Sequence, residues 1–318
     1  MHKQSIESPT GGICCEPGQV FADCNGHSAT AFQLYDLLHG TQYAQANTKW
    51  FAWMSSHFLN PLTFSAPYLF VVYNQRRGIF LPVGDNGADC WALGFGYPWF
   101  PETSFADAGW KHIRAKGDWN EPVPGQMYVQ NCRAINCCGG GSLAAANAFV
   151  PLTAVQIEGK GSTTARNVIA WMDARYGRRA DTDADGQEES YFYDTDPGFR
   201  FAATGLIAAA LATDGDSLRT LCRTPRKDIL AAPTLANVDY PSISVRSAEY
   251  SAPVLRFSVL KGVRAFSGKT DLVCSNVSAN ANVKRDGQPW TDAHRQGAML
   301  VIHTDVDTEH AFEVAPTP

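Results

Sequence analysis

The sequence predicts a mainly helical protein with a β-rich C-terminal segment. Over the first two thirds of the chain, apolar residues recur at helical spacing, and Gly or Pro stands where each helical pattern stops. From residue 233 onward, short alternating runs of apolar and polar residues are separated by Gly, Asn and Asp, a pattern typical of strands. We therefore expect a helical domain over residues 1–232 and a β-rich segment over 233–318 packed on it.

The first pair of helices is predicted over residues 28–58. Ser28 can cap the first helix, Phe32 belongs to its apolar face, and Gly40 stands just past its end. A second helix follows after a short turn and carries Trp50 on its apolar face, so the two helices form an antiparallel hairpin. The loop ahead of this hairpin faces the positive end of a helix dipole, which favours thiolates and other anions.

The middle of the chain is predicted to alternate helices with long loops. Residues 67–83 are rich in β-branched and aromatic residues and indicate a β-hairpin, with a buried helical segment as the alternative. Residues 84–138 contain four Trp among many Gly and Pro, which indicates one or two short helices and the ordered loops that often line pockets. Further helices are expected over residues 142–149, 162–176 and 199–212.

The composition excludes several classes of protein. A chain of 318 residues with 45% hydrophobic and 18% charged residues can bury an ample core. The net charge of −5 and the lack of a Lys/Arg cluster argue against nucleic acid, and no apolar run is long enough to span a membrane. The first residues lack the apolar stretch of a secretory signal, and nine cysteines do not suit a disulfide framework. We expect a cytoplasmic protein with mostly reduced thiols.

Residues 13–27 concentrate the side chains that can do chemistry. The run C-E-P-x-x-x-F-x-x-C-N begins at Cys15 and ends at Asn25, and an imidazole follows at His27. This run resembles the catalytic-cysteine segment of the linalool dehydratase-isomerase family. The resemblance implies an (α/α)6-barrel-like toroid, incomplete in this chain, and cofactor-free dehydration or isomerisation of allylic terpene alcohols in an apolar pocket.

The same resemblance assigns roles to individual residues. It implies that Cys15 and Cys24 are the catalytic pair that handles protons, without a cofactor or a metal ion. The residues expected to contact the substrate around them are Glu16, Phe21, Asn25 and His27. Cys14 is expected to be a packing residue, because the side chains of adjacent residues diverge.

The reaction explains why such residue types are needed. Loss of water from an allylic alcohol requires a proton for the leaving hydroxyl and a base for a neighbouring C–H, on either side of an apolar pocket. A thiol with a pKa of about 8.5 can take either part if its surroundings move the pKa toward neutrality. Aromatic faces stabilise allylic cationic character, so Tyr97 and Trp99 in the aromatic segment 89–102 are expected to form part of the pocket wall. Core packing is their alternative role.

The position of the cysteine segment differs from the family pattern. In the family this segment lies well inside the chain, and the acidic, histidine and tyrosine residues that complete the site precede it. Only fourteen residues precede Cys15 here, and the predicted helices are too few for six hairpins. We expect the later part of such a protein, with the missing groups supplied by a further N-terminal region or by the neighbouring subunit of a homo-oligomeric ring.

Other interpretations of the motifs stay open. The cysteines can be small buried hydrophobic residues, and a disulfide between Cys15 and Cys24 is geometrically possible. The cysteines at 14, 15, 24, 132, 137 and 138 could in principle bind zinc. Their spacings differ, however, from the closely spaced C-x2–4-C pairs of structural zinc sites. Residues 181–186 begin like a calcium loop, yet Phe192 occupies the position of the bidentate Glu. The glycines at 139–141 lack the ending of a phosphate-binding loop.

Two other functions fit the same sequence. One is a carbohydrate-active (α/α) toroid enzyme or a sugar-binding module, because Trp-rich loops bind sugars as readily as terpenes. The other is a non-catalytic remnant that binds an apolar ligand. Loss of activity on alkylation of the thiols would favour the lyase or isomerase over both.

Overall fold

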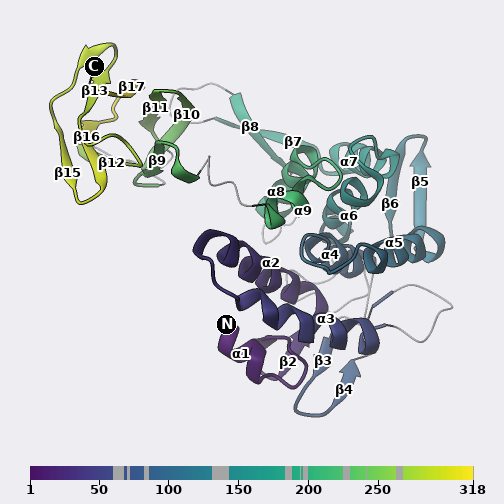
Figure 1. Ribbon diagram of the computed structural model, residues 1–318. Helices are drawn as coiled ribbons and strands as arrows, with labels where there is room; N and C mark the ends of the chain where they lie inside the picture. The colour runs from purple at the N-terminus through teal and green to yellow at the C-terminus, as the bar shows by residue number, and fades with distance from the viewer. Residues whose placement is uncertain are drawn as a thin grey trace. The chain divides into compact units, whose positions relative to one another are not determined.

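The computed structural model describes residues 1–59, 68–69, 72–81, 86–130, 143–182, 188–193, 195, 200–224, 230–240, 242–262 and 268–317 (Figure 1). The chain divides into two compact units. The first comprises residues 1–180 and 191–225, and the second comprises residues 181–190 and 226–318. Each unit buries a hydrophobic core of its own.

The first unit is built mainly of helices. They are α1 (His2–Glu7), α2 (Ala22–His39), α3 (Ala46–His57), α4 (Asn86–Gly96), α5 (Ser104–Lys116), α6 (Leu143–Glu158), α7 (Thr163–Tyr176), α8 (Arg200–Ala212) and α9 (Ser217–Arg223), with a 3-10 turn η1 (Tyr43–Gln45) before α3. Short strands β1 (Cys14–Glu16), β2 (Gln19–Phe21), β3 (Val72–Asn74) and β4 (Ile79–Leu81) form an antiparallel sheet in that order. Strand β5 (Trp119–Val123) pairs with β6 (Gln126–Val129). Strand β7 (Arg178–Thr182) pairs with β8 (Glu188–Tyr193), and residues 181–190 of this pair are counted in the second unit.

Helices α2, α4, α6 and α8 lie next to one another in that order and carry most of the first core (Figure 1). Helix α6 is apolar on all sides and buried from Ala144 to Gln156, as expected of a helix with neighbours all round. Its Thr153 donates a hydrogen bond to the carbonyl of Cys90 (2.6 Å) in α4. A Cβ at Gly94 would lie 2.6 Å from Thr153 Oγ1, so this glycine is what allows α4 and α6 to approach.

The second unit consists of strands in two antiparallel sheets. Its strands are β9 (Thr234–Asn237), β10 (Ile243–Ser251), β11 (Val254–Lys261), β12 (Lys269–Ser275), β13 (Ala281–Arg285), β14 (Gln288–Pro289), β15 (Ala293–Gln296), β16 (Met299–Asp305) and β17 (His310–Pro316). One sheet has the order β10-β11-β17-β13-β14 and the other β15-β16-β12-β9. Phe257 and Phe312 of the first sheet share one core with Leu272 and Ile302 of the second, so the unit is a β-sandwich.

The expected mainly α, toroid-like fold is wrong, whereas the β-rich C-terminal region is present. Within the described residues there are nine α-helices, and six hairpins would need twelve. The β-rich region is a sandwich with its own core rather than a tail, because its alternating side chains bury enough apolar surface for two sheets. Strands β1 and β2 of the four-stranded sheet were not predicted, because three-residue strands are too short to show a period.

Helix α2 also begins six residues earlier than Ser28. Its N-cap is Phe21, whose side chain makes no capping hydrogen bond, so the start carries no local sequence signal. Gly40 ends the helix in the left-handed conformation (φ 65°), as expected. The predicted hairpin over 67–83 corresponds to β3 and β4. None of the described helices is both long and apolar enough to cross a membrane.

Candidate functional site

The β1–β2 hairpin and the first two turns of α2 bring the predicted site residues into one segment. Cys15 and Glu16 lie on β1, and Phe21 stands directly ahead of α2. Cys24, Asn25 and His27 belong to the helix itself and not to a loop before it, because α2 starts at residue 22. The possible bridge between Cys15 and Cys24 is not formed, because none of the described cysteines is in a disulfide; they are Cys14, Cys15, Cys24, Cys90, Cys222 and Cys274.

Asn25 fastens the thiol-bearing strand to the start of the helix. Its side-chain oxygen accepts a hydrogen bond from the backbone N–H of Ile13 (2.7 Å). Its amide nitrogen donates to the carbonyl of Ile13 (3.1 Å) and to that of Phe21 (2.8 Å). The side chain is buried, so the energy of these three bonds is not lost to competing water. Asn25 therefore positions the residues that follow Ile13.

The two thiols differ in their surroundings. Cys15 is exposed, whereas Cys24 is partly buried and packs against the first core. Cys24 is the third residue of α2, where backbone N–H groups lack helical partners and the helix dipole favours negative charge. The buried carboxylate of Asp23 accepts a hydrogen bond from the backbone N–H of Cys24 (2.7 Å). Asp23 was not among the predicted site residues, although an acid in a first helical turn is a recognisable signal once the helix start is known.

His27 is held by aromatic residues of α4. Its Nε2 lies 2.8 Å from the indole nitrogen of Trp91, and its ring centroid is 4.2 Å from that of Phe95. Because an indole N–H can only donate, Nε2 is the acceptor and the imidazole proton resides on Nδ1. Burial of the ring lowers the pKa of His27 below its usual 6.5, although part of the residue stays exposed. Trp91 in turn stacks on Phe149 of α6 at 4.6 Å.

Spacing along α2 relates this imidazole to a thiol. Cys24 and His27 are three residues apart and so project from the same side of the helix. Phe21, by contrast, is almost fully buried and packs with Val72 beneath the hairpin. Glu16 is exposed and its carboxylate accepts a hydrogen bond from Gln19 (3.3 Å). The segment therefore carries thiols, an imidazole and a carboxylate, and the apolar side chain of Phe21 is buried beneath them.

Tyr97 and Trp99 lie in the core just beyond the end of α4. The hydroxyl of Tyr97 donates to Asp216 (2.7 Å), and burial together with this carboxylate raises the pKa of Tyr97. Arg219 donates to the backbone carbonyl of Tyr97 (2.7 Å) from α9. Trp99 packs edge-on against Phe51. Their part in a substrate-binding wall stays a prediction.

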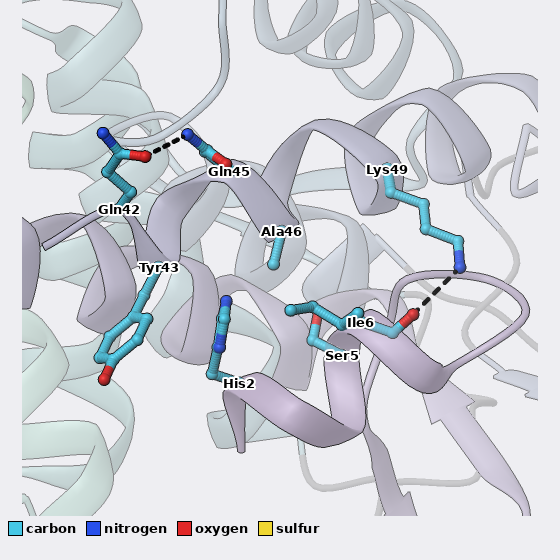
Figure 2. A pocket seen from close by; sticks show the side chains of 8 residues that line it. All are labelled: His2, Ser5, Ile6, Gln42, Tyr43, Gln45, Ala46 and Lys49. Atoms are coloured by element: carbon cyan, nitrogen blue, oxygen red, sulfur yellow. Dashed lines mark hydrogen bonds between the residues drawn. The ribbon is translucent and has the colours of Figure 1, made fainter.

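A separate pocket of about 470 Å³ lies between α1 and the stretch from η1 to α3 (Figure 2). Figure 2 shows His2 beside Tyr43 at one end and Lys49 reaching the carbonyl of Ile6 at the other (3.4 Å). Lys49 also donates to the carbonyl of Ser8 (2.5 Å). None of the predicted site residues lines this pocket.

Within the described part of the chain, no group of three or more His, Cys, Asp or Glu side chains could hold a metal ion. The cysteines at 132, 137 and 138, the glycines at 139–141 and the centre of the acidic loop, 183–187, lie outside the described residues.

A family model described as linalool dehydratase/isomerase matches residues 1–185. The matched range covers more than half of the chain and includes the β1–β2 hairpin, α2, α4 and α6. The resemblance first noticed in the spacing of Cys15, Phe21, Cys24 and Asn25 is therefore confirmed. Residues 226–318, which form most of the β-sandwich, lie beyond the match.

Proposed function

The chain belongs to the linalool dehydratase/isomerase family, and we propose that its first unit carries a cofactor-independent lyase or isomerase site for allylic terpene alcohols. The observation that supports this most directly is the fastening of the Cys15 strand to the start of α2 by Asn25. This contact sets one exposed thiol and one thiol in a first helical turn within a single rigid segment.

The two thiols divide the proton transfers in this proposal. Cys15 gives its proton to the hydroxyl oxygen of the substrate, the C–O bond breaks, and water leaves. Cys24, as a thiolate favoured by the positive end of the helix dipole at the start of α2, takes a proton from the carbon next to the allylic cation-like centre. After the reaction Cys15 is a thiolate and Cys24 is a thiol, so the enzyme has neither gained nor lost a proton. Proton exchange with solvent then reprotonates Cys15 and deprotonates Cys24. Isomerisation shares the first step; water then adds to the other end of the allylic cation and its proton returns to the Cys15 thiolate, which restores the starting state.

Aromatic residues behind α2 supply the apolar surroundings. Trp91 stacks on Phe149, and His27 contacts both Trp91 and Phe95. Aromatic faces favour a delocalised cation, and an apolar wall keeps water from adding to it prematurely. His27, neutral with its proton on Nδ1, can donate a hydrogen bond to the alcohol oxygen or to the thiolate.

The test is an anaerobic assay of the purified chain with linalool and with geraniol, followed by gas chromatography of the products. Replacement of one acid–base group is expected to lower kcat by about 10²- to 10⁴-fold, so Cys15→Ser and Cys24→Ser should each lose nearly all activity. Cys14→Ser is the matched control, because Cys14 is exposed on the same strand but is assigned no role.

Two results would contradict the proposal. One is turnover by the chain that survives both Cys15→Ser and Cys24→Ser. The other is the absence of turnover together with undiminished binding of linalool by Cys15→Ser, which would favour a non-catalytic protein that binds an apolar ligand.

A further inference from the structure

The β-sandwich contains a groove of about 550 Å³ at the open edge between its two sheets. One side is β13, and the other is β15 together with the start of β16. The chain passes from one sheet to the other through the short stretch after β14, so the edge strands β14 and β15 flank the groove. Its floor is apolar and includes Val283 and Leu300, which also belong to the sandwich core.

Trp290 stands in this groove in a fixed orientation. The guanidinium of Arg285 lies 4.5 Å from the centre of the indole ring and covers one face. The indole N–H donates to the carbonyl of His303 (3.2 Å), which fixes the rotation of the ring. Arg285 is itself held by a bidentate ion pair to Asp305, with both N···O distances at 2.9 Å. A preorganised indole borders the groove, so a ligand can pack on it without first ordering a side chain.

The charged side chains that line the groove are all basic. They are Lys284, Arg295 and, when protonated, His294. Lys284 and Arg256 both pair with the carboxylate of Glu313, at 4.0 and 3.0 Å. One anion therefore serves two cations, and a net positive charge remains. Arg295 donates to backbone carbonyls, those of Val277 (3.2 Å) and Ser278 among them, which orients its charge without neutralising it.

A second carboxylate, that of Asp292, interacts with His294 of the groove as well as with a lysine outside it. Asp292 lies between the groove residues Thr291 and Ala293 in sequence, and it is paired with Lys269 at 2.8 Å. A basic groove in a chain of net charge −5 is a local feature and not a consequence of composition.

From these features we infer that the groove binds an acidic oligosaccharide, a chain of uronate-type sugar rings, through Trp290 and the basic side chains around it. The apolar face of a sugar ring packs on the indole, and the ring carboxylate meets Lys284, His294 and Arg295. Asn282 and Thr291 at the rim offer hydrogen bonds to hydroxyl groups. A small inorganic anion would use the charges but not the indole, and a neutral sugar would use the indole but not the charges.

Isothermal titration calorimetry of the full chain can test the inference. The probe is an α-1,4-linked galacturonate trimer, and its fully methyl-esterified form is the matched neutral ligand. We expect the acidic trimer to bind at least about tenfold more tightly than the ester at low salt, with the difference shrinking as salt screens the charges. Lys284→Gln and His294→Gln, both at exposed positions, should each weaken binding about two- to fivefold, whereas Lys261→Gln outside the groove should leave it unchanged.

Trp290→Ala should abolish most of the affinity, and circular dichroism will show whether the sandwich still folds. If it does not fold, the exposed Lys284 and His294 variants carry the test. Equal binding of trimer and ester, no binding at millimolar trimer, or binding that ignores both exposed variants would each overturn the inference. Tighter binding of a single-stranded oligonucleotide than of the trimer would overturn it in favour of a nucleic-acid partner. None of these outcomes depends on the terpene reaction proposed for the first unit.

Discussion

Asn25 has a structural counterpart elsewhere in the first unit, which makes its role testable. Asn147, near the start of α6, accepts a hydrogen bond from the backbone N–H of Val129 (2.8 Å) and donates to the carbonyls of Val129 (3.0 Å) and Leu143 (2.9 Å). Asn25 makes the same three bonds to Ile13 and Phe21. Both side chains are buried, with 4% and 0% of their surface exposed. Each asparagine ties a preceding extended segment to a helix start, but only Asn25 does so beside the thiols.

Replacement of either asparagine by alanine removes three hydrogen bonds and leaves buried backbone groups without partners. At about 0.5–1.5 kcal/mol net for each bond, the free energy of unfolding should fall by about 2–4 kcal/mol in both variants. Their effects on the site should differ. We expect Asn25→Ala to lower turnover by a further factor of about 10 to 100, because a shift of about 1 Å in a reacting group has that cost.

Urea unfolding followed by far-UV circular dichroism gives the stability change, and turnover is measured where both variants are at least nine-tenths folded. A readout independent of turnover is the rate at which iodoacetamide alkylates Cys15, measured by mass spectrometry, which should change in Asn25→Ala only. The reasoning is refuted if Asn147→Ala alters turnover and alkylation as much as Asn25→Ala does. It is also refuted if Asn25→Ala costs no more stability than a substitution at the surface.

Three further predictions concern single contacts. Trp91→Phe removes the indole donor that favours neutral His27, so the imidazole pKa should rise, and nuclear magnetic resonance titration of the ring measures it. Gly94→Ala should lower the free energy of unfolding of the first unit by about 1–3 kcal/mol, because the new Cβ would lie 2.6 Å from Thr153 Oγ1. In a double-mutant cycle, a second substitution, Thr153→Ala, should recover part of this loss. Hydrogen bonding to a guanidinium lowers the pKa of Asp305 to about 2, so its contribution to stability is present above about pH 4 and is lost as the pH falls toward 2; Asp305→Asn should flatten the fall in melting temperature over this range.

Elements with complete local signals were predictable from the sequence. Helix α7 begins after Ser162, whose hydroxyl accepts a hydrogen bond from the N–H of Ala165 (3.0 Å), and ends before Gly177, as its capping residues indicate. The start of α2 was misplaced for the opposite reason. Phe21 provides no cap, and the helix start is fixed instead by Asn25, a contact between segments twelve residues apart.

The site was predictable only in part, because its components come from distant parts of the chain. The cysteine spacing indicated the family, which the family match confirms, whereas the roles of the individual residues stay predictions. The bond between His27 and Trp91 joins residues 64 positions apart, and no local pattern in either segment indicates it. The sequence also gives no sign that the Asn25 amide binds backbone groups or that the Tyr97 hydroxyl donates to Asp216.

The orientation of His27 also bears on which group acts as the base. A proton arriving at Nε2 would break the hydrogen bond from Trp91 and place a charge on an imidazole whose burial already lowers its pKa. Nδ1 carries the proton in this arrangement, so it can donate but cannot accept. In the proposed reaction the imidazole therefore serves as a hydrogen-bond donor throughout, and abstraction of the carbon-bound proton falls to a thiolate. A pH–rate profile whose acidic limb disappears in Cys24→Ser but persists in His27→Gln would agree with this division of roles, and the reverse would assign the base to His27.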